Sequence, residues 1–360
     1  MSKKENKMVT IWLIVVAVLI MGLVVFGGFV RLTRSGLSIV EWNPISGVVP
    51  PVGQQAWETE FAKYQETPEF QKVNATMTLE EYKEIFYLEY IHRLIARFAG
   101  LIVAIPLLYF LIKGIIPWRK SAVYVLIGLM FGFQGWLGWY MVSSGLVNNP
   151  AVSHYRLTFH LLTALLLLGL TVWMALQHLS GFPKRVPGAV KSTPFILSLT
   201  LLVVLILQIA YGGFMAGLKA GHVSNTYPLM FGVLVPPGML TIVEPWWLNL
   251  VSASTTVHFI HRWFAIVVLA VSIILYYLTR KRGYSRQLHQ SIILMVGLVG
   301  VQILLGALTV WFFVPTWIAL VHQATALLLF VTTIFINYRV LHEPVTAAEG
   351  VPTELEPTTA

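Results

Sequence analysis

The chain of 360 residues is 57% hydrophobic and only 11% charged, with a formal net charge of +9 and no cysteine. A soluble domain carries about 25% charged residues, so this composition excludes a soluble globular fold and indicates a membrane protein. The lack of cysteine excludes disulfides, thiolate nucleophiles and cysteine-ligated zinc or iron–sulfur sites. The positive charges lie in short clusters between apolar runs, which excludes nucleic-acid binding along a basic stripe.

Eight apolar runs are each long enough to cross a bilayer, which needs roughly 20 mostly apolar residues. We therefore predict an all-α integral membrane protein with eight transmembrane helices. The runs lie near residues 8–30, 88–112, 121–143, 156–178, 194–217, 256–279, 287–313 and 316–341. The last two form one charge-free stretch, which we divide at Val314, Pro315, Thr316 and Trp317 because proline ends helices and tryptophan favours the membrane interface.

The first apolar run follows MSKKENK and is longer than the roughly 7 to 15 residues of a signal-peptide core. We expect it to be retained as the first helix. With the N-terminus inside, most Lys and Arg outside the long first loop fall on the inner side, as the positive-inside rule favours, so both termini are expected in the cytoplasm. MSKKENK is short and contains an acid, unlike a mitochondrial transit peptide, which favours the plasma (inner) membrane of a bacterium.

The loop 31–87 is the longest segment between two spans. Thr78, Leu79, Glu80 and Glu81 form a capping-box pattern, which predicts a helix that begins there and continues toward His92. We expect further short helices in this loop, covering a site in the first half. The tail 343–360 combines glutamates and prolines with few large apolar residues, so we predict disorder there.

Motifs of the first half recur in the same order in the second. The pairs are GGFVRLTRSGLSIVEWNPISGVVPP from Gly27 with GGFMAGLKAGHVSNTYPLMFGVLVPP from Gly212, YIHRLIA from Tyr90 with FIHRWFA from Phe259, QGWLG from Gln134 with QILLG from Gln302, and HLLTALLL from His160 with HQATALLL from His322. They predict two tandem four-helix bundles, residues 1–180 and 181–342. Four is an even number of crossings, so the bundles share one orientation, as in a parallel pseudo-two-fold repeat.

Four of the ten histidines occupy repeat-equivalent positions near the outer side: His92 and His160 in the first half, His261 and His322 in the second. Two neutral imidazoles facing each other inside a four-helix bundle suit the axial ligation of haem iron. The alternative is hydrogen bonding between helices, worth about 0.6 kcal/mol on average. Zinc fits less well because few other ligands cluster there. The three inner histidines, His178, His289 and His342, flank basic loops and are expected at the membrane interface.

Charged residues beside these histidines are further candidates. Arg93 and Arg262 each follow a histidine and suit the carboxylates of haem propionates, although snorkelling to lipid headgroups is the alternative. Arg31, Arg34, Arg97 and Arg156 lie at the same outer edge. Glu89 is the only acid within the predicted spans and precedes His92 by three residues, which suggests proton transfer or substrate contact; the alternative is an ion pair with Arg93 or Arg97. The second half has His258 instead, as a polar contact or an alternative ligand.

At these residues the chain resembles the haem A synthase family. The resemblance covers about residues 8–341. Its carriers are RLTRSGLSIVEWNPISGVVPP from Arg31, EYIHR from Glu89, SHYRLTFH from Ser153, AGHVSNTYPLM from Ala220, FIHR from Phe259 and VHQATA from Val321. The chain is similar to the cysteine-free branch of the family, so no thiol relay is expected.

The resemblance implies oxidation of one ring methyl of haem O to a formyl group, giving haem A for cytochrome c oxidase. It implies a resident haem b at His261 and His322, with Arg262 beside it. It also implies that the first half binds haem O through His92 and His160, with Arg93 nearby. Glu89 would then move protons or position the methyl group.

The partners implied are the substrate haem O, membrane lipid, haem O synthase and the cytochrome oxidase assembly pathway. Homo-oligomerisation and the electron donor are left open. Two other functions compete: a haem transporter, because tandem parallel repeats also build transporters, and a haem b quinol oxidoreductase that only passes electrons.

Overall fold

The structure is a computed structural model that describes residues 2–147, 150–280 and 282–343, and it is helical, without a β-strand in those ranges. Within them, eight helices are long and apolar enough to cross a membrane. They are α1 (Lys3–Leu32), α4 (Leu79–Ile112), α5 (Ala122–Val142), α6 (His154–Leu179), α7 (Thr193–Gly217), α9 (Ser254–Arg280), α10 (Arg286–Trp311) and α11 (Thr316–His342). The predicted all-α membrane fold is confirmed, including the break before Pro315.

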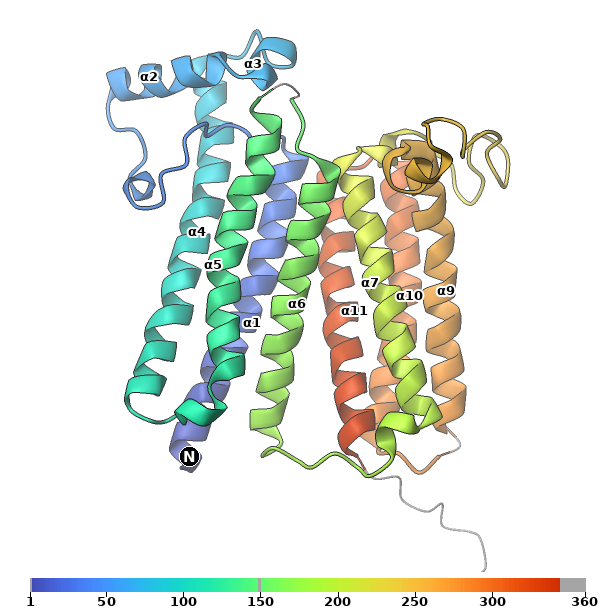
Figure 1. Cartoon of the computed structure of the whole chain (residues 1–360). Helices are drawn as coiled ribbons and strands as arrows, with labels where there is room; N and C mark the ends of the chain where they lie inside the picture. The colour runs from blue at the N-terminus through green and yellow to red at the C-terminus, as the bar shows by residue number, and fades with distance from the viewer. Residues whose placement is uncertain (1, 148–149, 281, 344–360) are drawn as a thin grey trace, which may run out of the picture.

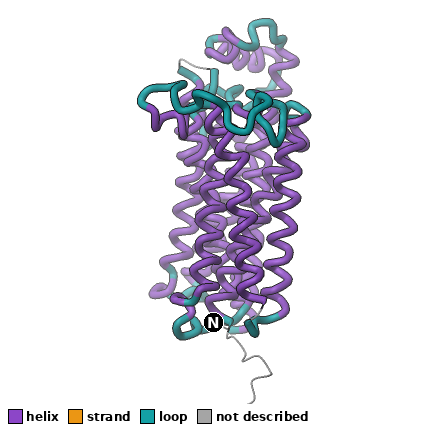
Figure 2. Tube along the Cα trace, turned by 90° about the vertical axis from the view of Figure 1, so that its right-hand side faces the viewer, coloured by secondary structure: helices purple, strands orange, loops and turns teal. Residues whose placement is uncertain are grey.

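The long helices run nearly parallel and form two groups side by side (Figures 1 and 2). In the first half, α1 contacts α4, α4 contacts α5, α5 contacts α6, and α6 returns to α1. In the second half, α7, α9, α10 and α11 follow one another in the same closed order. This agreement supports the pseudo-two-fold repeat, which stays an interpretation of the sequence.

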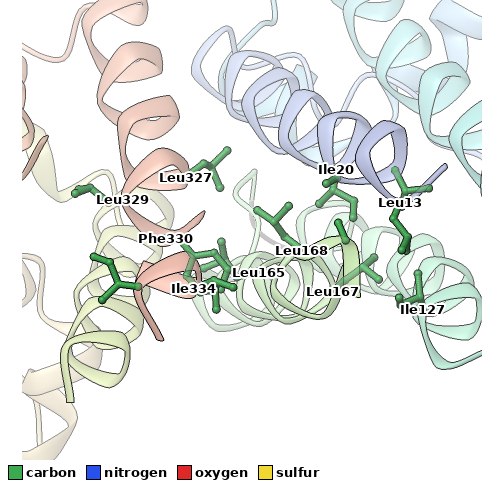
Figure 3. Packing of buried hydrophobic residues seen from close by; sticks show 14 of the residues in the cluster. Leu13, Ile20, Ile127, Leu165, Leu167, Leu168, Leu327, Leu329, Phe330 and Ile334 are labelled. Carbon is green, nitrogen blue, oxygen red and sulfur yellow. The ribbon is translucent and has the colours of Figure 1, made fainter. Parts of the chain in front are cut away.

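A continuous apolar core joins the two halves through α1, α6, α7 and α11. Leucines on α6 face two ways: Leu165 lies beside Phe330 of α11, while Leu167 lies toward Ile20 of α1 and Ile127 of α5 (Figure 3). A hydrogen bond also connects the two halves: Gln323 Nε2 of α11 donates to the Val24 carbonyl of α1 at 2.7 Å. The halves therefore pack as one membrane body.

Helix α4 is longer than its predicted span because the capping box of Thr78 and Glu81 forms as expected and starts the helix at Leu79. Its proline, Pro106, lacks the N–H that would bond the Ile102 carbonyl. The indole Nε1 of Trp12 on α1 donates to that carbonyl at 3.1 Å. A membrane interior supplies no water for such a group, so this contact satisfies an otherwise unpaired carbonyl.

Short helices occupy the end of the bundle opposite the N-terminus, called the outer end here after the predicted orientation. The first loop contains η1 (Ser46–Val48), α2 (Gln54–Gln65) and α3 (Pro68–Lys72), and Figure 1 shows α2 and α3 above α4. Trp57 and Tyr64 of α2 pack with Tyr82 and Phe86 of α4, and we call this unit the outer cap. The prediction of short helices in this loop is confirmed.

Other short helices complete the connections: η2 (Trp118–Lys120), η3 (Ser143–Gly145), η4 (Ala189–Lys191), η5 (Ala220–His222), η6 (Trp246–Leu248) and α8 (Asn249–Ser252). The outer loop of the second half holds η5, η6 and α8. No pair of helices like α2 and α3 occurs in its described residues. The outer cap is therefore a difference between the halves.

His178 lies in the last turn of α6, where it is 2% exposed and its ring contacts the Tyr124 hydroxyl at 2.7 Å and Asn6 Oδ1 at 2.6 Å; its place at the membrane interface stays a prediction. Two expectations need correction. Glu89 is not the only acid in a membrane-crossing helix, since α4 also includes the glutamates of its first turn. Glu343, assigned to the disordered tail, accepts from the Ser285 backbone N–H and pairs with Arg339; the remaining tail, 344–360, lies outside the described residues.

Candidate functional site

The second half brings His261 of α9 and His322 of α11 together. Their ring centroids are 6.3 Å apart and the ring planes are inclined by 74°. A metal–imidazole bond is about 2 Å long and the ring centroid lies roughly 1.2 Å behind the nitrogen, so two imidazoles on opposite sides of one metal ion have centroids about 6.4 Å apart. The observed separation therefore fits a pair of axial ligands.

Each of the four repeated histidines packs against a glycine of a neighbouring helix. A Cβ built on Gly27 would lie 3.1 Å from a ring atom of His92, and the matching distances are 3.8 Å for Gly138 and His160, 3.3 Å for Gly212 and His261, and 3.2 Å for Gly306 and His322. Three of these four distances are shorter than most Cβ contacts in proteins, so a larger side chain there would require the imidazole to shift. The glycines let the imidazoles lie directly on a helix backbone, and the sequence signal for them was their recurrence in the GGF and Gln-x-x-Leu-Gly motifs.

Glutamines hold the second-half histidines from the adjacent helices. Gln208 Nε2 donates to the His261 carbonyl at 2.9 Å, and Gln302 Nε2 donates to the His322 carbonyl at 3.0 Å. The Oε1 atoms of both glutamines and Nδ1 of His322 are buried without a hydrogen-bond partner. Buried polar atoms are normally paired, so these atoms are consistent with a bound polar group such as a haem between α7, α9, α10 and α11.

In the first half, the two repeated histidines also lie against glycines of neighbouring helices. The His92 ring stacks on Phe26 with centroids 6.0 Å apart, while His160 lies beside Gly138. Nδ1 of His160 and Nε2 of Gln134 are buried without partners. This half therefore also offers unpaired polar atoms to a ligand.

Glu89 is 3% exposed and its carboxylate accepts four hydrogen bonds. Oε2 accepts from the Ser38 backbone N–H at 2.8 Å, the Ser38 hydroxyl at 2.7 Å and the Ile39 N–H at 3.0 Å. Oε1 accepts from Arg93 Nη2 at 2.6 Å. Glu89 thus ties the start of the first outer loop to α4, beside His92.

Arg93 and Arg262 bind the outer loops in equivalent ways. Arg93 donates to the carbonyls of Ile39 and Glu41 and lies over the Trp42 ring. Arg262 donates to the carbonyls of Pro228 and Leu229 and lies over the Tyr227 ring. Both arginines therefore clamp a loop onto the helix that carries a repeated histidine. Nε of Arg262 is buried without a partner and remains available to a ligand carboxylate.

His258 takes the position of Glu89 in the second half. It is 1% exposed, and its Nε2 accepts from Arg262 Nη2 at 3.0 Å. Among the other arginines, Arg97 donates to the carbonyls of Asn43 and Pro44, and Arg156 donates to the Tyr140 carbonyl. Within the described ranges, no group of three His, Cys, Asp or Glu could hold a metal ion, so a zinc-like cluster is not found there.

A second buried carboxylate, which the sequence did not single out, lies in the outer cap. Glu69 of α3 is 6% exposed, and Oε2 accepts from the Tyr64 hydroxyl at 3.3 Å. Burial raises the pKa of Glu69 to about 7, and the nearby charge of Glu89 acts in the same direction. Glu69 is buried because α3 packs against Tyr64 of α2. The hydropathy of the sequence does not show this contact.

The paired histidines, their glycines and the loop clamps can be compared with known families. The family model of the COX15-CtaA cytochrome oxidase assembly proteins matches residues 10–334. The chain belongs to this family. Several curated relatives, all described as heme A synthase, match nearly full length. A protein of Nitrosospira multiformis is 42% identical over 92% of this chain and 93% of its own length. A protein of Wolbachia pipientis is 38% identical over 92% of this chain and 92% of its own length. A protein of Agrobacterium fabrum is 40% identical over 91% of this chain and 89% of its own length.

Proposed function

We propose that this chain is an enzyme that converts haem O to haem A by oxidising a ring methyl group to a formyl group. The observation that carries the proposal is the pair of His261 and His322, whose 6.3 Å centroid separation suits axial ligation of a haem iron. Relatives that share about two fifths of their residues with this chain over most of its length are named for the same activity.

The two halves have different roles in this proposal. The second half would hold a resident haem b through His261 and His322, and the unpaired Nε of Arg262 would be available to a carboxylate of that haem. The first half binds the substrate haem O through His92 and His160. Haem iron, when bound, supplies the oxidising power that protein side chains lack.

The proposal keeps Glu89 as the catalytic carboxylate of the first half. Its position, one helical turn before His92, suits it to hold or move a proton beside the substrate. Three of its four hydrogen bonds fall on Oε2, from Ser38 and Ile39, and only the one from Arg93 falls on Oε1, so a proton or a substrate group can approach the second acceptor site of Oε1. Arg93 binds the same carboxylate and the loop, which makes it the residue that positions Glu89 as well as a candidate partner for a propionate.

We place the protein in the plasma membrane of a bacterium, with both termini in the cytoplasm and the histidine sites toward the outer side. Haem O is hydrophobic and arrives from the membrane, so haem O synthase and the cytochrome oxidase assembly pathway are the expected neighbours.

Haem analysis tests the proposal directly. Membranes that contain this chain together with haem O synthase should yield haem A on extraction and chromatography, whereas membranes with haem O synthase alone should yield haem O. A haem transporter or an electron-passing haem b protein would leave haem O unchanged. Unchanged haem O in membranes that hold folded, haem-loaded protein would refute the enzymatic function.

A further inference from the structure

The two halves differ where the second helix of each bundle meets the third. In the first half, a Cβ built on Gly128 of α5 would lie 2.9 Å from Leu107 of α4, so the two helices touch there. Seven residues make two helical turns and return to the same face. Because α4 and α5 run in opposite directions, seven residues outward from this contact are Gly100 on α4 and Gly135 on α5, on the same helix sides as Leu107 and Gly128. Gly100 is half-buried and Gly135 is exposed. We call this pair the glycine seam.

The glycine seam is open. A Cβ built on Gly100 or on Gly135 would meet no heavy atom within 4 Å. Counting from the aligned IHR and Gln-x-x-Leu-Gly motifs, the equivalent residues of the second half are Leu269 of α9 and Ile303 of α10. Both of these side chains pack against the apolar core. The first half therefore lacks two aliphatic side chains that fill the same place in the second.

The seam adjoins the histidine site of the first half. Gly135 precedes Gly138, the glycine beside His160, by three residues, which is about 4.5 Å of helix rise. Gln134 is the chain neighbour of Gly135, and its Nε2 is buried without a partner, as is Nδ1 of His160. These polar atoms are independent of the glycines and point to a ligand in the same bundle. The region thus combines unpaired polar groups with two glycines whose sides no other side chain covers.

The occupant must be polar at one end and carry an apolar extension. This step rests on the proposed function, in which the second half holds haem b and the first half holds haem O. Haem O differs from haem b by its hydroxyethylfarnesyl tail, and the halves differ by the two missing aliphatic side chains. We infer that the glycine seam takes the isoprenoid tail of the substrate between α4 and α5, and so selects a prenylated haem over haem b.

Refilling the seam tests this assignment. The double variant Gly100→Leu with Gly135→Ile gives the first half the residues of the second. The matched control is Gly297→Leu on α10, because Gly297 also meets nothing within 4 Å and the equivalent residue of α5 is Leu129. Leucine and isoleucine are better helix formers than glycine, so the helices should form, and the absorption spectrum of the resident haem b reports folding.

The measurement is a titration of the purified full-length protein, containing its resident haem b, with haem O and separately with haem b, followed by difference absorption. The double variant should bind haem O at least about tenfold more weakly, a loss of one decade in affinity. Its affinity for added haem b, which has no tail, should stay within about twofold of wild type, and the Gly297→Leu control should bind both haems normally.

Three results would overturn the inference. The double variant could bind haem O as well as wild type, it could lose both haems equally, or mass spectrometry could find a phospholipid retained in wild type and lost in the variant while haem O binding is unchanged. Failure of the proposed function is distinguishable from all of these. It would show as wild-type protein that neither binds haem O nor forms haem A.

Discussion

Glu89 offers the sharpest test of how the first half works, through the substitution Glu89→Gln. Glutamine has one acceptor oxygen where the carboxylate has two. It can keep the three donors from Ser38 and Ile39 only by turning its amide NH2 toward Arg93, which now sits 2.6 Å from Oε1. Breaking one partner of a buried ion pair costs about 3 to 5 kcal/mol, so a lower yield of folded protein is expected whatever the chemistry.

Catalysis has to be measured per folded molecule for this reason. A general acid or base contributes about 10²- to 10⁴-fold to a rate, so Glu89→Gln should lower haem A formed per bound haem b by about 100-fold or more. The resident haem b spectrum should keep its wild-type shape, because His261 and His322 lie in the other half. The assay is chromatography of extracted haems, normalised to haem b absorption.

Ser38→Ala separates catalysis from loop anchoring. It removes the hydroxyl that donates to Glu89 at 2.7 Å but leaves the carboxylate and both backbone N–H donors, at a cost of about 1.5 to 3 kcal/mol for a hydrogen bond to a charged group. A catalytic Glu89 predicts near-normal turnover in this variant. Haem A synthesis at the wild-type level per haem b in Glu89→Gln, or an equal loss in both variants, would contradict the catalytic role and leave Glu89 as an anchor of the loop.

Three more predictions concern other parts of the molecule. His322→Ala should abolish the low-spin haem b spectrum of the purified protein, and an unchanged spectrum would place the haem elsewhere. The pKa of Glu69, raised from 4.5 to about 7 by burial, means that the folded state binds this proton more tightly than the unfolded state, so stability falls as pH rises from about 4.5 to 7, by about 3 kcal/mol in all. Glu69→Gln should therefore flatten the decline of the thermal unfolding midpoint over that range, and equal declines in both proteins would show that Glu69 does not titrate there. Trp12→Phe should leave the Ile102 carbonyl unpaired and cost about 1 to 3 kcal/mol, and adding Pro106→Ala should restore much of it by supplying the missing N–H; denaturation midpoints without such rescue would refute the pairing.

The membrane topology could be predicted because it depends on local properties. Runs of about 20 apolar residues have few alternatives to a spanning helix, and the capping box at Thr78 and the proline at 315 act through their immediate neighbours. The four repeated histidines could be predicted because the same residue returned at matching places in two divergent halves. The pairing of His261 with His322 could be predicted because the second and fourth spans of a half run in the same direction, which puts their histidines at similar depth.

What could not be predicted are contacts between residues far apart in the chain. Glu89 was interpreted as an embedded acid, but the Ser38 and Ile39 amides that bind it lie some fifty residues earlier. Its arginine partner was one of two alternatives, and the structure selects Arg93 over Arg97. The role of the glycines beside the histidines could not be predicted either. It depends on which helices are neighbours, and the sequence does not show which imidazole packs on a given glycine.

Helix α4 has one more consequence, which concerns mechanics. Its 34 residues span about 51 Å, against about 30 Å for the hydrocarbon core of a bilayer. The N-terminal part of α4 therefore extends beyond the hydrocarbon core. It packs against the outer cap near Tyr82 and Phe86 and carries Glu89 and His92 further along. The one interruption in the hydrogen bonding of α4 is at Pro106, below both residues, where helices bend most readily. The outer cap and His92 thus lie on the same side of Pro106, on one helical segment whose backbone hydrogen bonds proline does not interrupt.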